Sequence, residues 1–388
     1  MSSERRAGFI SGVLAGAAAA LAIVALVVEL TDTDLSDATL VDQARAVIEA
    51  NYFEEVTADE LDDASVQGMV RELRQRYDDR FSHYFAPDDL EAFDSATSGE
   101  FTGVGLTVTE VPRGLRVASV FPDTPAARGG LEEGDVITAV DGKSIAGKPS
   151  QVSTTQIKGP EGTEVELRID PAAGGKPRQA TLERASVRIP AAKGRLARAG
   201  GSQVAYVRYA TFSDGAHEEL RSEIERLDRK GAEGLVLDLR GNGGGLLNEA
   251  VLSAGLFVEE GDVVTTESRT RGETVYDALG DALPQRPTVV LINQDTASAA
   301  EILAAALQSY DLATIAGTRS YGKGVFQEVI RLPVGGALDL TVGEYVTADG
   351  TSLAGAGLKP AVPAEDDPET PADEALQSAL DALAAQVR

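Results

Sequence analysis

Residues 37–98 carry apolar positions that recur with the period of a helix. In LVDQARAVIEANY, Leu40, Ala44, Val47 and Ile48 fall on one face. DDASVQGMVRELRQRY and PDDLEAF predict two further helices. An aromatic cluster is expected between them: Phe81, Tyr84 and Phe85. The pattern therefore predicts a small helical packing segment.

Residues 99–186 show the alternation of short strands instead. GVGLTVTEV and GLRVASV alternate apolar and polar positions. Pro125 suits the first position of a one-turn helix, and Asp141-Gly142 predicts a tight hairpin turn. A second short helix is predicted over 150–157. We expect a compact β-rich unit.

The rest of the chain has a mixed α/β pattern. The continuous apolar runs GLVLDL and PTVVLIN predict strands buried on both faces, and LLNEAVLSAGLFV and SAAEILAAALQSY predict helices after them. VFQEVIRL and ALDLTVGEYVT predict two later strands. We therefore expect an α/β core over 187–362 and a closing helix within 363–388.

The amino terminus predicts a membrane segment. Arg5 and Arg6 precede the uncharged stretch 7–28, and a spanning helix needs about 20 apolar residues. Basic residues tend to stay cytoplasmic, so the remaining chain is expected outside the cytoplasmic membrane. A cleaved signal peptide that would export the protein is the alternative, although the stretch is long for one. We assign 1–36 to this segment and its acidic linker.

Charge and composition remove several function classes. With 35 basic and 62 acidic residues, the net charge is −27, which argues against nucleic-acid binding and against membrane attachment by surface charge alone. The absence of cysteine excludes disulfides, thiolate metal sites and cysteine nucleophiles. His83 and His217 are too few for a His-rich metal centre, and both have ordinary structural explanations. We predict no metal and no cofactor.

A glycine-rich turn is the first candidate for chemistry. DLRGNGGGLL, residues 238–247, lies between a predicted buried strand and a predicted helix, where backbone N–H groups can hold an anion. The segment lacks the spacing of a dinucleotide fingerprint or a P-loop. Gly243 stands where trypsin-fold proteases with a similar GNSGG run carry their serine. The turn alone supports either an oxyanion hole or a structural turn.

Ser298 opens the helix predicted after the strand that ends at Asn293. Glu301 lies three residues later, so a capping box explains the pair structurally. The same position exposes the serine hydroxyl at a positive helix end, which also suits a nucleophile.

Lys323 lies between two glycines in GTRSYGKGVFQEVIRL and is predicted to start a strand. Lys323, Val325 and Gln327 would then share one strand face. A lysine that acts as a base needs an apolar site that keeps its amine neutral, whereas an ordinary lysine is an exposed charge.

Together these motifs resemble the C-terminal processing peptidases, or tail-specific proteases, which are PDZ-containing serine proteases with a Ser-Lys dyad. TASAAE is similar to the family's serine motif and GKG to its lysine motif. The resemblance implies that Ser298 is the nucleophile, Lys323 the base and Gln327 the residue that orients the lysine. It also implies an oxyanion hole from the N–H groups of Gly244 and Ala299, with Gly243 or Gly245 as alternatives to Gly244.

SVFPDTPAARGGLEEGDVITAVDG resembles the PDZ domain of bacterial exported proteases. The resemblance places the carboxylate-binding loop at GVGL, which is Gly103, Val104, Gly105 and Leu106. Lys158 stands where relatives often carry an arginine that couples the PDZ domain to the protease. The sequence departs from the family at RQRYDDR, at Phe81 and at Thr296, and we expect none of these departures to touch the dyad.

The implied fold is α+β and α/β multidomain, with crotonase-like strand–turn–helix units in the protease core. The implied function is a membrane-anchored, extracytoplasmic serine endopeptidase that recognises protein C-terminal tails. An adaptor or a homo-oligomer stays open as a partner. A catalytically inactive PDZ scaffold is the alternative, and a crotonase-like enzyme acting on acyl-thioesters is a third hypothesis.

Overall fold

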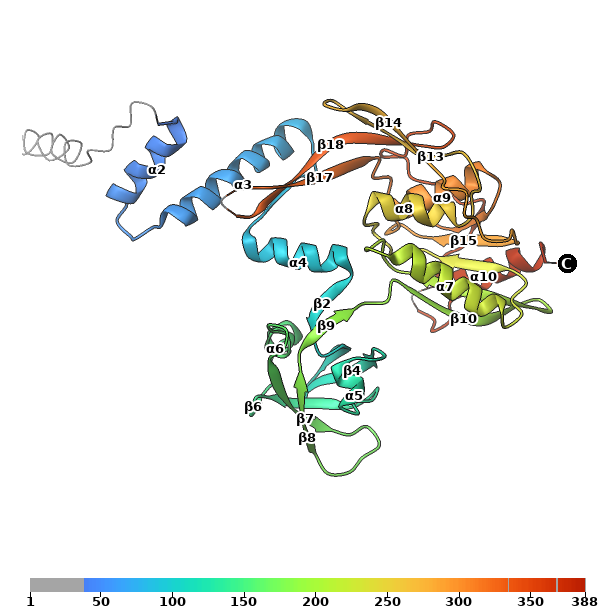
Figure 1. Cartoon of the computed structure of the whole chain (residues 1–388), viewed down its shortest axis with the longest axis horizontal. Coiled ribbons are helices and arrows are strands. Elements are labelled where there is room, and N and C mark those ends of the chain that lie inside the picture. Colours follow the sequence, from blue (N-terminus) through green and yellow to red (C-terminus); the bar gives the residue numbers. More distant parts are fainter. Residues whose placement is uncertain (1–37, 334, 368, 388) are drawn as a thin grey trace, which may run out of the picture. The chain divides into compact units, whose positions relative to one another are not determined.

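The computed structural model describes residues 38–387, apart from 334 and 368. The predicted membrane segment at 7–28 lies outside the described residues. Within the described part of the chain, no helix combines the length and apolar character needed to span a bilayer. The chain divides into two compact units, one ending at Arg80 and one beginning at Phe81 (Figure 1).

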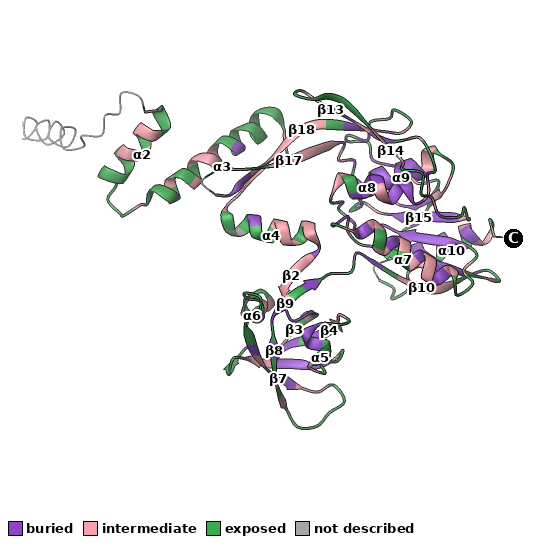
Figure 2. Ribbon diagram, in the orientation of Figure 1, coloured by how far each residue is buried: buried purple, intermediate pink, exposed green. Residues whose placement is uncertain are grey.

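The first unit consists of α2 (Leu40–Asn51) and α3 (Ala58–Tyr77), so its helical prediction is confirmed. Thr39 and Thr57 cap these helices with their side chains. α2 buries none of its residues and α3 buries only Val70. Figure 2 shows both helices mainly in the colours of exposed and intermediate residues. The two helices therefore do not enclose a core of their own.

The second unit begins with a strand, in a part of the chain for which the sequence predicted an aromatic cluster between two helices. β1 (His83–Phe85) pairs antiparallel with β18 (Ala337–Thr347), and α4 (Pro87–Ser98) follows it. Phe85 stacks on Phe93 of α4, whereas Phe81 meets Tyr321 edge to face. The helix predicted over PDDLEAF is confirmed, whereas the strand was not predicted because it forms by pairing with a segment distant in sequence.

The β-rich unit has the predicted hairpins and short helices. Its sheet has the order β3 (Leu106–Val111), β4 (Gly114–Val120), β5 (Val136–Val140), β7 (Glu164–Asp170) and β8 (Arg178–Glu183), with β6 (Lys143–Ser144) beside β5. α5 (Pro125–Arg128) is capped by Thr124, and α6 (Ser150–Ile157) packs beside the same sheet. Asp141 (φ 47°) and Gly142 (φ 72°) form the predicted tight turn. β2 (Glu100–Gly103) and β9 (Ala185–Arg188) pair where the chain enters and leaves this unit.

The α/β core is built on a sheet that is parallel apart from its first strand. Its order is β10 (Ala192–Ala199), β11 (Ser202–Tyr209), β12 (Leu235–Asp238), β15 (Thr288–Ile292), β16 (Thr314–Gly317) and β19 (Val362–Pro363). Side chains alternate across it, so Leu235 and Leu237 face one cluster and Val236 the other.

Helices cover both faces of this sheet, and their sequence patterns follow from that burial. One face packs against α7 (Ala216–Asp228), α8 (Leu247–Gly255) and α9 (Ala299–Ser309), and the other packs against α10 (Glu374–Ala384). The strands are therefore buried on both sides, as their continuous apolar runs predicted. Figure 2 shows this burial in β15 and α9.

A second sheet holds the long hairpin beside the lysine motif. It contains β13 (Asp262–Ser268), β14 (Gly272–Asp277), β17 (Val325–Arg331) and β18. β17 and β18 pair antiparallel, with a register shift where Phe326 is followed by Gln327.

Candidate active site

The predicted protease residues gather at the carboxyl ends of the parallel strands. The glycine-rich turn follows β12, the serine motif follows β15 and the lysine motif follows β16. This edge is where open α/β sheets usually bind ligands. A hollow of about 780 Å³ lies along it and is lined by Arg240, Asn293 and Tyr321, among other residues.

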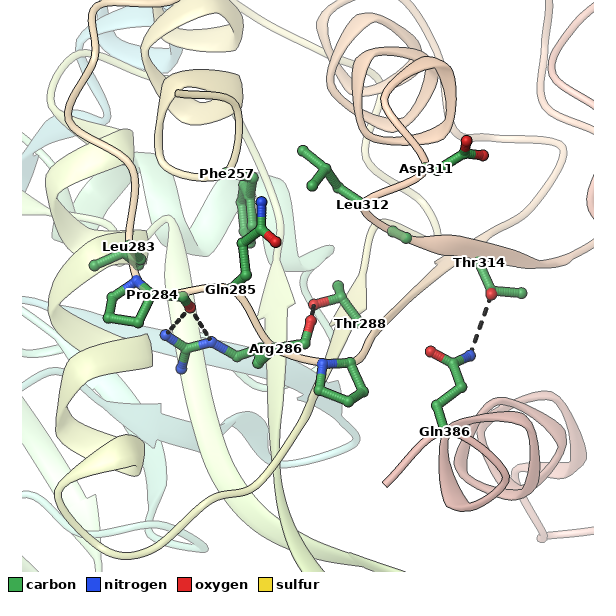
Figure 3. Close-up of a pocket in the computed structure, with 12 residues that line it drawn as sticks. Phe257, Leu283, Pro284, Gln285, Arg286, Thr288, Asp311, Leu312, Thr314 and Gln386 are labelled. Atoms are coloured by element: carbon green, nitrogen blue, oxygen red, sulfur yellow. Dashed lines mark hydrogen bonds between the residues drawn. The ribbon is translucent and has the colours of Figure 1, made fainter. Parts of the chain in front are cut away.

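A second hollow, of about 420 Å³, lies at the opposite ends of the same strands. Its lining includes Pro287 before β15, Thr288 at the start of β15 and Leu312 before β16. The Gln386 amide donates to Thr314 Oγ1 at its rim (Figure 3). No predicted site residue lines either hollow. The carboxyl edge is favoured for the chemistry because the three motifs follow β12, β15 and β16 there.

Ser298 directly precedes α9 in an unusual backbone conformation. Its φ of 57° and ψ of −122° lie where non-glycine residues are rarely found. The Ser298 N–H donates to Glu301 Oε2 at 2.9 Å, and the preceding Ala297 N–H donates to the Asn242 carbonyl at 3.0 Å. A sharp strand-to-helix turn of this kind presents a nucleophile in other hydrolases.

The glycine-rich turn lies directly against this serine. A Cβ added to Gly244 would be 2.9 Å from Ser298 Cβ and 3.0 Å from Ala299 N, and Gly244 has a φ of 106°. Only glycine fits both the space and the conformation. The turn therefore reaches the position from which it can supply an oxyanion donor.

The two expected oxyanion donors differ in what they bind. Ala299 is the first residue of α9, and its N–H has no acceptor among the described residues. The Gly244 N–H donates to Asn242 Oδ1 at 2.9 Å, so its role stays a prediction. Sequence reasoning missed Asn242, which is fully buried and donates through Nδ2 to the Tyr209 carbonyl. Its place inside a glycine-rich turn was the available signal.

Lys323 lies in a loop and not at the start of a strand, so the shared-face argument was wrong. β17 begins at Val325. Gly322 and Gly324 have φ values of 81° and 61°, which break the strand alternation on both sides of the lysine. A Cβ on Gly324 would be 2.5 Å from Ala354 Cα, so the glycines also allow this neighbouring segment to approach.

The Lys323 ammonium lies 5.1 Å from the centre of the Phe81 ring. The expectation that the departure at Phe81 would not touch the dyad was therefore wrong. Burial lowers the pKa of Lys323, and the negative charges of Asp339 and Glu301 oppose this shift. A lowered pKa increases the neutral fraction that a general base requires.

The backbones of Ser298 and Lys323 are joined by a shared hydrogen-bond acceptor. Glu301 Oε2 accepts the Ser298 N–H at 2.9 Å and the Lys323 N–H at 3.1 Å. The Gln327 amide donates to Thr341 Oγ1 at 3.2 Å. Across the described residues, no hydrogen bond joins the side chains of Ser298, Lys323 and Gln327. Hydrogen bonds of a catalytic group can be long before substrate binds.

The predicted carboxylate loop lines a small hollow in the β-rich unit. Gly103, Val104, Gly105 and Leu106 surround about 50 Å³ together with α6 residues and Lys158. The Lys158 ammonium lies 5.5 Å from the centre of the Phe101 ring beside this loop. The structure therefore brings all five predicted residues to one groove between β3 and α6.

The two histidines lie in other surroundings. The His83 ring is within hydrogen-bond distance of the Ser82 carbonyl, and the His217 ring is 2.8 Å from Glu249 Oε2. Neither ring forms a hydrogen bond with Ser298 in the part of the chain described.

Comparison with known proteins matches both parts of the second unit. The family model described as peptidase family S41 matches residues 203–364, and the model described as PDZ domain matches residues 116–170. The first range includes the serine, lysine and glycine-rich motifs, and the second lies within the β-rich unit.

Relatives of known name match most of the chain. The carboxy-terminal-processing protease of Bartonella bacilliformis is 36% identical over 307 residues, covering 78% of this chain and 69% of that protein. Carboxy-terminal processing protease CtpA of Bacillus subtilis is 32% identical, covering 82% of this chain and 67% of that protein. The solved photosystem II D1 C-terminal processing protease matches with a TM-score of 0.50 and 30% identity, covering 90% of this chain and 97% of that one.

Proposed function

This chain belongs to peptidase family S41 and contains a PDZ domain, and from that premise we propose that Ser298 and Lys323 form its catalytic dyad. Family membership makes the chain a serine-type peptidase of the C-terminal processing kind. The observation that carries the dyad is the single Glu301 oxygen that accepts both backbone N–H groups.

In the proposed reaction, neutral Lys323 Nζ removes the proton from Ser298 Oγ as this oxygen attacks a peptide carbonyl. The Ala299 N–H and a donor of the glycine-rich turn stabilise the oxyanion. Lys323 then protonates the leaving amine and activates the water that releases the acyl group. Gln327 orients the lysine amine. No hydrogen bond joins Lys323 Nζ and Ser298 Oγ among the described residues, so the transfer requires the two atoms to come within hydrogen-bond distance when substrate binds.

The PDZ domain is proposed to bind the carboxyl terminus of a protein substrate. The backbone N–H groups of Gly103–Leu106 suit a carboxylate, and the small hollow behind them suits an apolar last side chain. We further propose that residues 7–28 anchor the chain in the cell membrane and that catalysis is extracytoplasmic.

The decisive experiment measures cleavage of an unstructured protein by the wild type, Ser298→Ala and Lys323→Ala. Each variant should lose cleavage while keeping the wild-type circular dichroism spectrum, because each lacks one partner of the acyl-transfer step. Full turnover by either folded variant would contradict the dyad. An inactive wild type that still binds a peptide with a free carboxyl terminus would favour the PDZ scaffold.

A further inference from the structure

Glu301 is a buried carboxylate with more hydrogen bonds than its place in the helix requires. It is fully buried and lies in the first turn of α9. Its Oε2 accepts the N–H groups of Ser298 and Lys323, and its Oε1 accepts the Gly322 N–H at 2.7 Å and the Ser320 hydroxyl. No salt bridge to it occurs within the described residues.

A helix cap alone does not account for this arrangement. A capping glutamate needs only the N–H of the residue before the helix, here Ser298. The three other donors come from the lysine loop, residues 320–323, which lies beyond the next strand in sequence. Burying a carboxylate is costly unless several donors satisfy it, so this loop supplies most of the compensation.

The contacts extend to the segment behind the lysine loop. Ser320 Oγ, which donates to Glu301, also accepts the Leu358 N–H at 2.6 Å. A Cβ on Gly322 would be 2.7 Å from Gly357 N, so that segment packs closely against the loop. The position of Lys323 is thus fixed by backbone contacts on two sides, one of which ends on Glu301.

We propose that Glu301 is a positioning residue, whose carboxylate holds the Ser298 turn and the Lys323 loop at the separation required for proton transfer. The inference rests on the proposed dyad. Glu301 does not contact the reacting atoms in this mechanism. It acts through the backbone of the two residues that do.

Glu301→Gln tests this directly, because an amide cannot replace the carboxylate in either orientation. Each carboxylate oxygen accepts two donors: Oε2 accepts two backbone N–H groups, and Oε1 accepts one backbone N–H and one hydroxyl. The NH₂ group of glutamine would therefore face either Ser298 and Lys323 or Gly322. The hydrogen bonds to one of the two oxygens must therefore break, while the side-chain volume is conserved.

The expected result is a fall in kcat on the order of 100-fold with little change in KM, since misplacing a catalytic group by about 1 Å has that effect. The acid limb of the kcat profile should also move to lower pH. Burial lowers the pKa of Lys323, and the negative charges of Asp339 and Glu301 oppose this shift. Removing the Glu301 charge leaves the lysine neutral at lower pH.

Glu249→Gln is the matched control. Glu249 is also a nearly buried glutamate in the first turn of a helix, and it accepts the Gly215 and His217 N–H groups at 3.0 and 2.9 Å. We expect this variant to lose stability but to keep the kcat and the acid limb of the wild type per folded molecule. Thermal unfolding of both variants gives the folded fraction.

Ser320→Ala provides a second measurement if Glu301→Gln does not fold, since it removes one donor and keeps the carboxylate. This variant should lower kcat by a larger factor than it changes KM. Wild-type kcat in either folded Glu301→Gln or folded Ser320→Ala would overturn the inference, as would a loss equal to that of Glu249→Gln. An inactive wild type, or an active Ser298→Ala, would instead contradict the proposed function.

Discussion

Ser298 occupies a backbone conformation that its own side chain does not favour, and the surrounding contacts hold it there. Gly244 packs against its Cβ, and Glu301 binds its N–H. A strained residue held by several independent contacts is typical of a functional site. At this scale, small changes in the neighbours should have large effects on the rate.

Gly244→Ala should reduce kcat by about 100-fold, because its Cβ would displace the glycine-rich turn from Ser298 and Ala299. Gly255→Ala is the control, since its Cβ would meet nothing closer than Leu279 N at 3.6 Å. Steady-state kinetics of the two variants checks the prediction. Equal activity of both would show that the turn does not support the site.

The pH dependence of kcat/KM should be governed by Lys323, with activity rising as the lysine loses its proton. Burial lowers the pKa of Lys323, and the negative charge of Asp339 opposes this shift. Asp339→Asn should therefore move the acid limb to lower pH, whereas Glu344→Gln, an exposed change on the same strand, should leave it in place. A limb that moves to higher pH would contradict the assignment of Lys323 as the base.

Among the elements, α10 is joined to the end of β12 by a partly buried charge network. The Arg240 guanidinium bonds Asp238 at the end of β12 and both Asp366 and Asp373, the last of which caps α10. Burial opposes the charge of Arg240, but the hydrogen bonds and charges of Asp238 and Asp373 outweigh it and raise its pKa. The network fixes the strand from which the glycine-rich turn departs.

Arg240→Ala should lower the free energy of unfolding by about 3–5 kcal/mol, because it leaves the fully buried Asp238 without its main cation. Arg271→Ala, which breaks an exposed pair with Glu328, should cost only about 0–1 kcal/mol. Urea unfolding of the two variants separates these values. Equal losses would mean that the network contributes no more than a surface ion pair.

For the molecule as a whole, we expect substrate binding at the PDZ domain to control cleavage. Lys158→Ala should leave the affinity for a peptide with a free carboxyl terminus nearly unchanged and reduce the activation of cleavage by that peptide. Calorimetric binding and a cleavage assay on the full chain check the two effects. A parallel loss of binding and cleavage would show that Lys158 only holds the peptide.

The sequence by itself determined most of the order of elements and the identity of the motifs, because both depend on local patterns. Continuous apolar runs predicted β12 and β15, and the short motifs around Ser298 and Lys323 indicated the family. Each of these depends on neighbouring residues or on fixed spacing, which can be counted along the chain.

The tertiary structure decided what lies around those motifs. In the folded chain, the Phe81 ring lies beside the Lys323 ammonium, and β1 pairs with β18. Glu301, which the sequence predicted only as a helix cap, also accepts the N–H of Lys323. Lys323 also lies outside the strand, because the glycine before it and the glycine after it both have positive φ. These contacts join residues far apart in sequence, and such pairings depend on how the whole chain packs.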